Sequence, residues 1–159
     1  MGLHPLEWEE LVRQTATASP YNAEVVRAAF RRAQAVVALL TPDDEARLHP
    51  SLASADDPEH ERQPSGQPRP NVLIEAGMAL HGQPHRIVVI EIGRFRPASD
   101  LAGMNTVRID GTSSEPLKAI ALRLQTPGCA ANDTGTDWLN FARFSRLLAL
   151  TRRPASPQA

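Results

Sequence analysis

The sequence has almost no cysteine and no surplus of positive charge. Its one cysteine, Cys129, excludes an intramolecular disulfide and any cysteine-based metal cluster. The formal net charge of -1 provides no basic excess for binding along a nucleic-acid backbone. No apolar run approaches the ~18 residues that a membrane-spanning helix needs, and residues 1–5 do not begin a secretion signal. We therefore expect neither nucleic acid nor a membrane as a partner, and the cytoplasm is the default compartment.

Several common catalytic and nucleotide-binding motifs are also missing. There is no Gly-x-x-x-x-Gly-Lys-Ser/Thr phosphate loop, no Gly-x-Gly-x-x-Gly fingerprint and no Gly-x-Ser-x-Gly nucleophile elbow. Among the five histidines, only His81 and His85 are close enough in sequence to suggest a metal, and they flank a turn. The sequence therefore predicts no metal site, and neither ATP hydrolysis nor Rossmann-type hydride transfer has its usual signature.

What the sequence does contain is an alternation of apolar strands and helices. The continuous apolar runs at residues 35–40 and 87–90 lack polar alternation, which is typical of parallel strands covered on both faces. A shorter strand is predicted at 106–109, and an edge strand at 3–8 because that run contains a proline. Helical patterns cover residues 22–33, 71–81 and 115–124. This βαβ alternation predicts an α/β fold with a parallel sheet.

The segments that follow each predicted strand are the candidates for ligand binding, since ligands of such sheets bind beyond the carboxyl ends of the strands. One such segment is residues 9–21. Residues 41–70 form a connection longer than the ~12–15 residues usual for structureless loops, which suggests a lid or a binding surface, although the polar stretch 56–62 also suits a disordered excursion. Within residues 91–103, Asp100 could accept hydrogen bonds from ligand hydroxyls or cap a helical turn.

Glu75 is the leading candidate for a catalytic residue. It lies in the most apolar helical run, and helical spacing puts it on one face with Val72, Met78 and Ala79. Burying an ionised carboxylate among such neighbours is costly unless another group pairs with it or the reaction uses it. The sequence therefore predicts a buried, functional Glu75. The alternative is a structural ion pair with Arg69 or Arg86.

Three segments of this chain together resemble the bacterial TIR-like domains of predicted nucleotide-binding proteins. The most specific string is Arg-x-Asn-Val, two apolar residues and Glu-x-Gly, and the resemblance spans roughly residues 3 to 125. The segments are Ala33–Asp44, Arg69–Ala79 and Ser99–Gly103. This resemblance implies a flavodoxin-like, TIR-like three-layer fold with a parallel sheet, over residues 1–128.

The resemblance implies a function as well. In TIR domains the helix-borne glutamate, here Glu75, is implicated in cleaving NAD at the nicotinamide–ribose bond. NAD is then the substrate, no cofactor is needed, and the domain is a defence effector that self-associates to complete its site. The residues expected to contact NAD or a related nucleotide are Trp8, Thr41, Asp43, Asp44, Arg69, Asn71 and Asp100.

Two further hypotheses for the function of this site remain open. One is a module that senses a nucleotide without cleaving it. The other resembles nucleoside deoxyribosyltransferases, which also use a glutamate on a flavodoxin-like fold to attack an anomeric carbon.

The chain departs from the family pattern at its start. Family members usually begin with a strand and a helix ahead of the segment that matches residues 3–8, and this sequence lacks both, so we expect an N-terminally incomplete sheet. Apolar side chains beside residues 36–40 should then be exposed. Residues 129–150 are predicted to be a helical extension, beginning near Asp137, that packs on the domain or contacts another copy, and residues 151–159 are predicted to be a disordered tail.

Overall fold

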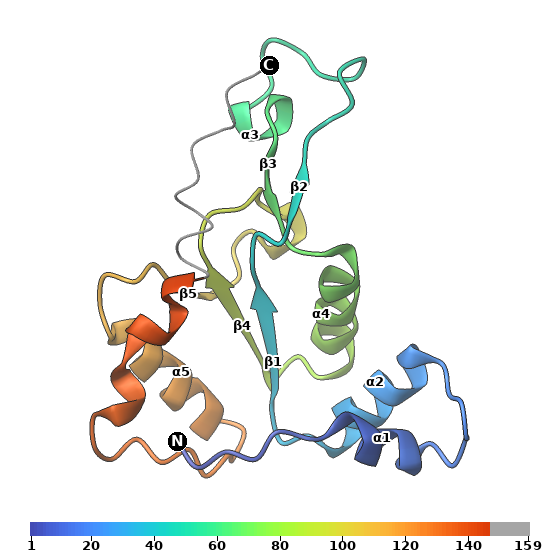
Figure 1. Cartoon of the computed structure of the whole chain (residues 1–159), viewed down its shortest axis with the longest axis vertical. Coiled ribbons are helices and arrows are strands. Elements are labelled where there is room, and N and C mark those ends of the chain that lie inside the picture. The colour runs from blue at the N-terminus through green and yellow to red at the C-terminus, as the bar shows by residue number, and fades with distance from the viewer. Residues whose placement is uncertain (147–159) are drawn as a thin grey trace.

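The computed structural model describes residues 1–146 and is built around a parallel three-stranded sheet (Figure 1). The strands are β1 (Val36–Leu40), β4 (Ile87–Ile92) and β5 (Val107–Ile109), in the order β1-β4-β5. Val36 lies opposite Ile87, and Ile90 lies opposite Val107. The predicted α/β class and parallel sheet are confirmed, and the two longest apolar runs form adjacent strands of that sheet.

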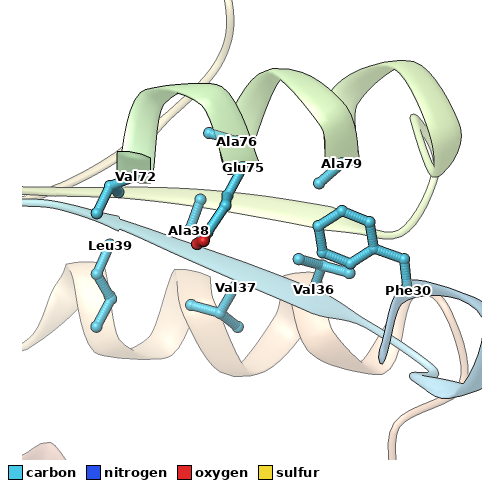
Figure 2. A pocket seen from close by; sticks show the side chains of 9 residues that line it. All are labelled: Phe30, Val36, Val37, Ala38, Leu39, Val72, Glu75, Ala76 and Ala79. Atoms are coloured by element: carbon cyan, nitrogen blue, oxygen red, sulfur yellow. The ribbon is translucent and has the colours of Figure 1, made fainter. Parts of the chain in front are cut away.

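Helices cover the two faces of this sheet. Helix α4 (Pro70–Gly82) packs on the face that presents Ala38, Leu40 and Val89. Helix α5 (Glu115–Gln125) packs on the opposite face, against Val88 and its neighbours. Figure 2 shows the two helices on either side of the strands. The resulting helix, sheet and helix layers agree with the TIR-like, flavodoxin-like fold predicted from the sequence.

The spacing of apolar residues explains how each helix meets the sheet. The buried residues of α5 recur at the positions that one helical face requires, namely Leu117, Ile120, Ala121 and Leu124. Helix α4 begins with Pro70, whose fixed φ suits a first helical residue. Its buried residues are only Ala76 and Ala79, and such small side chains allow the helix backbone to approach β1 closely.

The N-terminal segment differs from its prediction. Residues 3–7 do not form a strand, and Trp8–Gln14 form helix α1, so the predicted strand at 3–8 is wrong. Glutamates in the first turn of α1 and Arg13 in its last turn suit the helix dipole. Leu11 is buried where α1 packs on α2 (Asn22–Arg32), and Glu10 pairs with Arg32. The segment 9–21, which we expected as a loop after a strand, therefore contains a helix.

The long connection between β1 and α4 contains an antiparallel ribbon. Strands β2 (Asp44–Ala46) and β3 (Ser65–Gln67) pair with each other, and α3 (Glu59–Arg62) lies between them in the chain. Figure 1 shows the ribbon projecting beyond the carboxyl end of β1. An ion pair between Glu61 and Arg96 ties it to the segment after β4. Residues 41–70 are therefore a structured excursion at the edge of the sheet where ligands usually bind.

The C-terminal region forms short 3-10 turns where a helix was predicted. These turns are η2 (Asp137–Leu139) and η3 (Phe141–Phe144), and an earlier 3-10 turn, η1 (Ser99–Leu101), follows β4. Trp138, Leu139 and Phe144 pack against the core cluster under α5, which supports the packing role of this extension. Residues 147–159, including the predicted tail, lie outside the described residues. Within residues 1–146, no helix has both the length and the apolarity to cross a membrane.

Candidate functional site

Glu75 faces a shallow groove along the outer edge of β1, with a volume of about 290 Å³. Figure 2 shows its carboxylate pointing from α4 toward β1, at the level of Ala38. The other lining residues are Phe30, Val36, Val37, Ala38, Leu39, Val72, Ala76 and Ala79. Among the described residues that line this groove, Glu75 is thus the only one with an ionisable side chain.

The predicted burial of Glu75 is wrong, because its side chain is exposed to solvent. Val72 and Ala79 line the same groove as the helical spacing predicts, whereas Met78, the third predicted neighbour, does not line it. What the spacing does not reveal is that β1 is an edge strand. Among residues 1–146 its only strand partner is β4, so the face of α4 beside its outer edge meets water. Desolvation therefore gives no reason to regard Glu75 as a site, and what distinguishes it is its place in an apolar groove.

Neither arginine suggested as a structural partner pairs with Glu75 within the described residues. The Arg86 guanidinium donates to the carbonyl of Ala33 (2.9 Å) and to the Gln83 side chain. Arg69 occupies the N-cap position of α4, six residues before Glu75 and so about 240° around the helix from it. Within residues 1–146, no hydrogen bond or ion pair engages the Glu75 carboxylate, which leaves it available to a ligand.

The groove also shows that β1 is covered on one face only. Val37 is 43% exposed and Leu39 is 49% exposed, because α5 packs on β4 and β5 and does not extend over β1. The prediction that this strand is buried on both faces is therefore wrong. The prediction that apolar side chains beside residues 36–40 are exposed is confirmed.

Three predicted ligand contacts lie at the carboxyl end of β1, where the chain enters the ribbon. The Thr41 hydroxyl donates to the Asp43 carboxylate (2.8 Å). Asp44 opens β2 opposite Gln67. Thr41 and Asp43 precede the ribbon and Asp44 is its first residue, and none of the three lines the Glu75 groove.

The remaining predicted contacts are distributed over three elements. Trp8 is the first residue of α1 and is 46% exposed, while Asp100 is exposed in η1. Arg69 and Asn71 are exposed at the start of α4. None of the four lines the Glu75 groove. In this structure the side chains proposed to hold the ligand do not converge on Glu75.

Sequence reasoning missed Phe30, which closes one end of the groove (Figure 2). Phe30 lies on α2, and its position beside Glu75 depends on the packing of α2 near α4. Within its own helix it is simply one more apolar residue, so no local pattern identifies it. A second and larger cavity lies beyond the ends of β4 and β5. The sequence indicates it only through the general rule that ligands bind beyond the carboxyl ends of parallel strands.

The fold and the groove together define a class of protein, an α/β domain with a parallel sheet and a glutamate on the helix beside its edge strand. The family model described as the TIR domain of the CAP12/Pycsar effector protein matches residues 1–111. The chain therefore belongs to this family of TIR-like defence effector domains. No curated protein and no solved structure matches the chain.

The matched region includes both the candidate glutamate and the whole sheet. It contains β1, α4 with Glu75, β4 and β5, and it ends four residues before α5 begins at Glu115. The resemblance noted in the sequence and the matched family thus overlap over residues 3–111, a range that includes α4.

Proposed function

We propose that this domain hydrolyses NAD at the nicotinamide–ribose bond and that Glu75 is its catalytic residue. The observation that carries this proposal is the Glu75 carboxylate, which within residues 1–146 is unpaired and is the single ionisable group in its groove, on a helix within the family match. A carboxylate held among apolar side chains is suited to stabilising a positive charge that develops beside it.

The chemistry requires only one carboxylate. When the bond between the ribose anomeric carbon and the pyridinium nitrogen breaks, the bonding electrons neutralise that nitrogen, so nicotinamide leaves without a proton. The ribose ring becomes oxocarbenium-like, and a nearby carboxylate stabilises it as in glycoside hydrolysis. Water then adds to the anomeric carbon and loses a proton to solvent. Because Glu75 is exposed, water reaches this position readily.

The size of the groove indicates which part of NAD it would hold. A volume of about 290 Å³ is at the lower end of the range for small-molecule sites. Phe30 and Val72 offer apolar surface to a planar ring on either side of Glu75. We therefore place the nicotinamide and its ribose in the groove. A second copy seated on the open side would exclude water and strengthen the electrostatic effect of Glu75.

The direct test is NAD turnover by the full chain carrying Glu75→Gln. The amide preserves the shape of the side chain and removes its charge, so we expect turnover to fall by ~10²-fold or more with an unchanged melting temperature. Glu45→Gln is the matched control, since Glu45 is exposed on β2 and does not line the groove. Equal turnover by the two variants would exclude Glu75 as the catalytic residue.

One observation favours a second candidate, a module that binds a nucleotide without cleaving it. The side chains expected to contact the ligand do not converge on Glu75, and the Glu75 carboxylate is exposed to solvent. Saturable NAD binding with no release of nicotinamide, at concentrations high enough to promote self-association, would support the sensor. Parallel incubation with deoxynucleosides tests the transferase, whose signature is exchange of the base.

A further inference from the structure

A cavity of about 890 Å³ lies beyond the carboxyl ends of β4 and β5. Its walls come from the segment after β4, from the end of β5 and from His60 on α3. It shares no lining residue with the Glu75 groove. The volume falls within the range of small-molecule sites, and the position is the one where parallel α/β sheets usually bind ligands.

One wall of the cavity carries an ordered polar cluster around Glu91. The Glu91 side chain is only 12% exposed, and its carboxylate accepts hydrogen bonds from the Thr106 hydroxyl (3.0 Å) and from Arg108 Nε and Nη2 (2.9 and 2.5 Å). These contacts satisfy Glu91 and fix the orientation of Arg108. The Arg108 side chain remains 71% exposed, so the rest of its guanidinium can meet a ligand.

A second cation and an anion complete the polar lining. Arg94 is exposed and has no ion pair or side-chain hydrogen bond within residues 1–146. Asp110 accepts hydrogen bonds on Oδ1 from the backbone N–H of Thr112 (2.9 Å) and from its hydroxyl (2.7 Å). The bonds orient the carboxylate and leave Oδ2 able to accept from a ligand. The cavity thus presents two guanidinium groups and two oriented carboxylates, of which Glu91 is paired with Arg108 and Asp110 has no ion pair within residues 1–146.

The rest of the lining is largely apolar. It includes Phe95 and Leu101, which also pack against the core under α4, and Met104, which is 38% exposed. Anchored apolar side chains of this kind provide a firm surface for a flat ring.

We propose that this cavity binds a nucleoside monophosphate. The phosphate faces Arg94 and Arg108, because guanidinium groups bind phosphate oxygens with strong charge-assisted hydrogen bonds. The ribose hydroxyls donate to Asp110, and the base lies against Phe95, Leu101 and Met104. The site is distinct from the Glu75 groove and holds whether or not Glu75 cleaves NAD.

The test is calorimetric titration of the full chain with AMP, adenosine and inorganic phosphate. We expect AMP to bind saturably and at least about tenfold more tightly than adenosine or phosphate, since only AMP engages both ends of the cavity. Arg94→Gln should weaken AMP binding by about tenfold or more and leave adenosine binding unchanged. Asp110→Asn should weaken binding of AMP more than binding of its 2′,3′-dideoxy analogue.

Two control variants locate the binding. Arg27→Gln replaces an exposed arginine on α2, and Glu75→Gln alters the other site, so both should bind AMP like the unaltered chain. In NMR spectra, AMP should shift the amide resonances of Gly93 and Gly103, which line the cavity. The amide resonance of Gly77 on α4 should not change. The proposal is overturned if the unaltered chain fails to bind AMP. It is also overturned if Arg94→Gln and Asp110→Asn bind AMP normally, or if Glu75→Gln abolishes binding.

Discussion

Gly66 lies at a close approach between the ribbon and the body of the domain. A Cβ at this position would lie 2.5 Å from Pro42 Cβ and 3.1 Å from the Arg94 carbonyl oxygen. The backbone N–H of Arg96 also donates to the Gly66 carbonyl (2.7 Å), so the strand is held against the segment after β4. The absence of a side chain at Gly66 therefore lets the ribbon pack against the segment that lines the second cavity.

We predict that Gly66→Ala destabilises the domain by about 1–3 kcal/mol, because the added methyl group displaces the ring of Pro42 or the segment after β4. The measurement is the free energy of unfolding in urea. Gly77→Ala is the matched control, since nothing lies within 4 Å of a Cβ there, and in mid-helix it should stabilise by about 0.5–1 kcal/mol. Equal effects of the two changes would contradict the close approach.

Asp110 shows how a single turn controls a charge at the second cavity. The side-chain and backbone hydrogen bonds from Thr112 hold the pKa of the Asp110 carboxyl below its usual range. A lowered pKa means that these bonds add stability above the pKa of the unfolded chain, and that this stability is lost as the pH falls through the lower folded value.

We predict that Thr112→Val raises the Asp110 pKa toward its ordinary value, because the variant removes the hydroxyl donor and keeps the backbone N–H. Titration of the Asp110 carboxyl carbon by NMR measures this change directly. Thr134→Val is a control that removes a similar hydroxyl bond, to Asn132, outside this turn. If the Asp110 pKa is unchanged in Thr112→Val, the hydrogen bond from the Thr112 hydroxyl is not what lowers it.

At the scale of elements, β1 is the most unusual part of the domain. Its outer edge has no strand partner within residues 1–146, and Val37 and Leu39 are exposed on one face. Unpaired apolar edges favour pairing with a second chain, and natural proteins often protect such edges with lysine.

We predict that the 159-residue chain self-associates through this edge and that Leu39→Lys weakens the association. Sedimentation velocity over a range of concentrations measures the effect. Leu122→Lys is the matched control, because Leu122 is exposed on α5, away from β1. A monomer at every concentration, or equal weakening by both variants, would contradict a role for the edge.

The elements also differ in how readily local patterns identify them. The periodicity of residues 115–124 predicts α5 closely, because its apolar face is buried as the pattern requires. Residues 3–8 also carry an apolar pattern, over a shorter stretch, yet no strand forms there. A helix satisfies its own backbone hydrogen bonds, whereas a strand needs a partner edge, and residues 3–7 pair with none.

At the scale of the whole molecule, stability should decrease from the centre of the sheet outward. Strand β4 pairs on both sides and contributes to both core clusters, whereas β1 pairs on one side only. The ribbon forms a separate two-stranded sheet, and such a sheet has little stability of its own.

We predict that native-state hydrogen exchange is slowest in β4, intermediate in β1 and fastest in β2 and β3, since amide protection follows burial and pairing. Exchange followed by NMR resolves the three classes. Ligand bound in the second cavity should slow exchange in the segment after β4. Protection of the ribbon equal to that of β4 would show that the whole chain unfolds as one unit.

The sequence by itself determined the α/β class, the parallel strands β1, β4 and β5, the helices α2, α4 and α5, and the family. Each of these depends on local periodicity or on a short string such as the one around Glu75, and the structure and the family match bear them out. Only the tertiary structure decided that Glu75 is exposed, that Phe30 lies beside it and that a separate cavity forms around Arg94 and Asp110. The reason is physical: a pattern shows which side chains share a face, but burial depends on which other elements pack over that face.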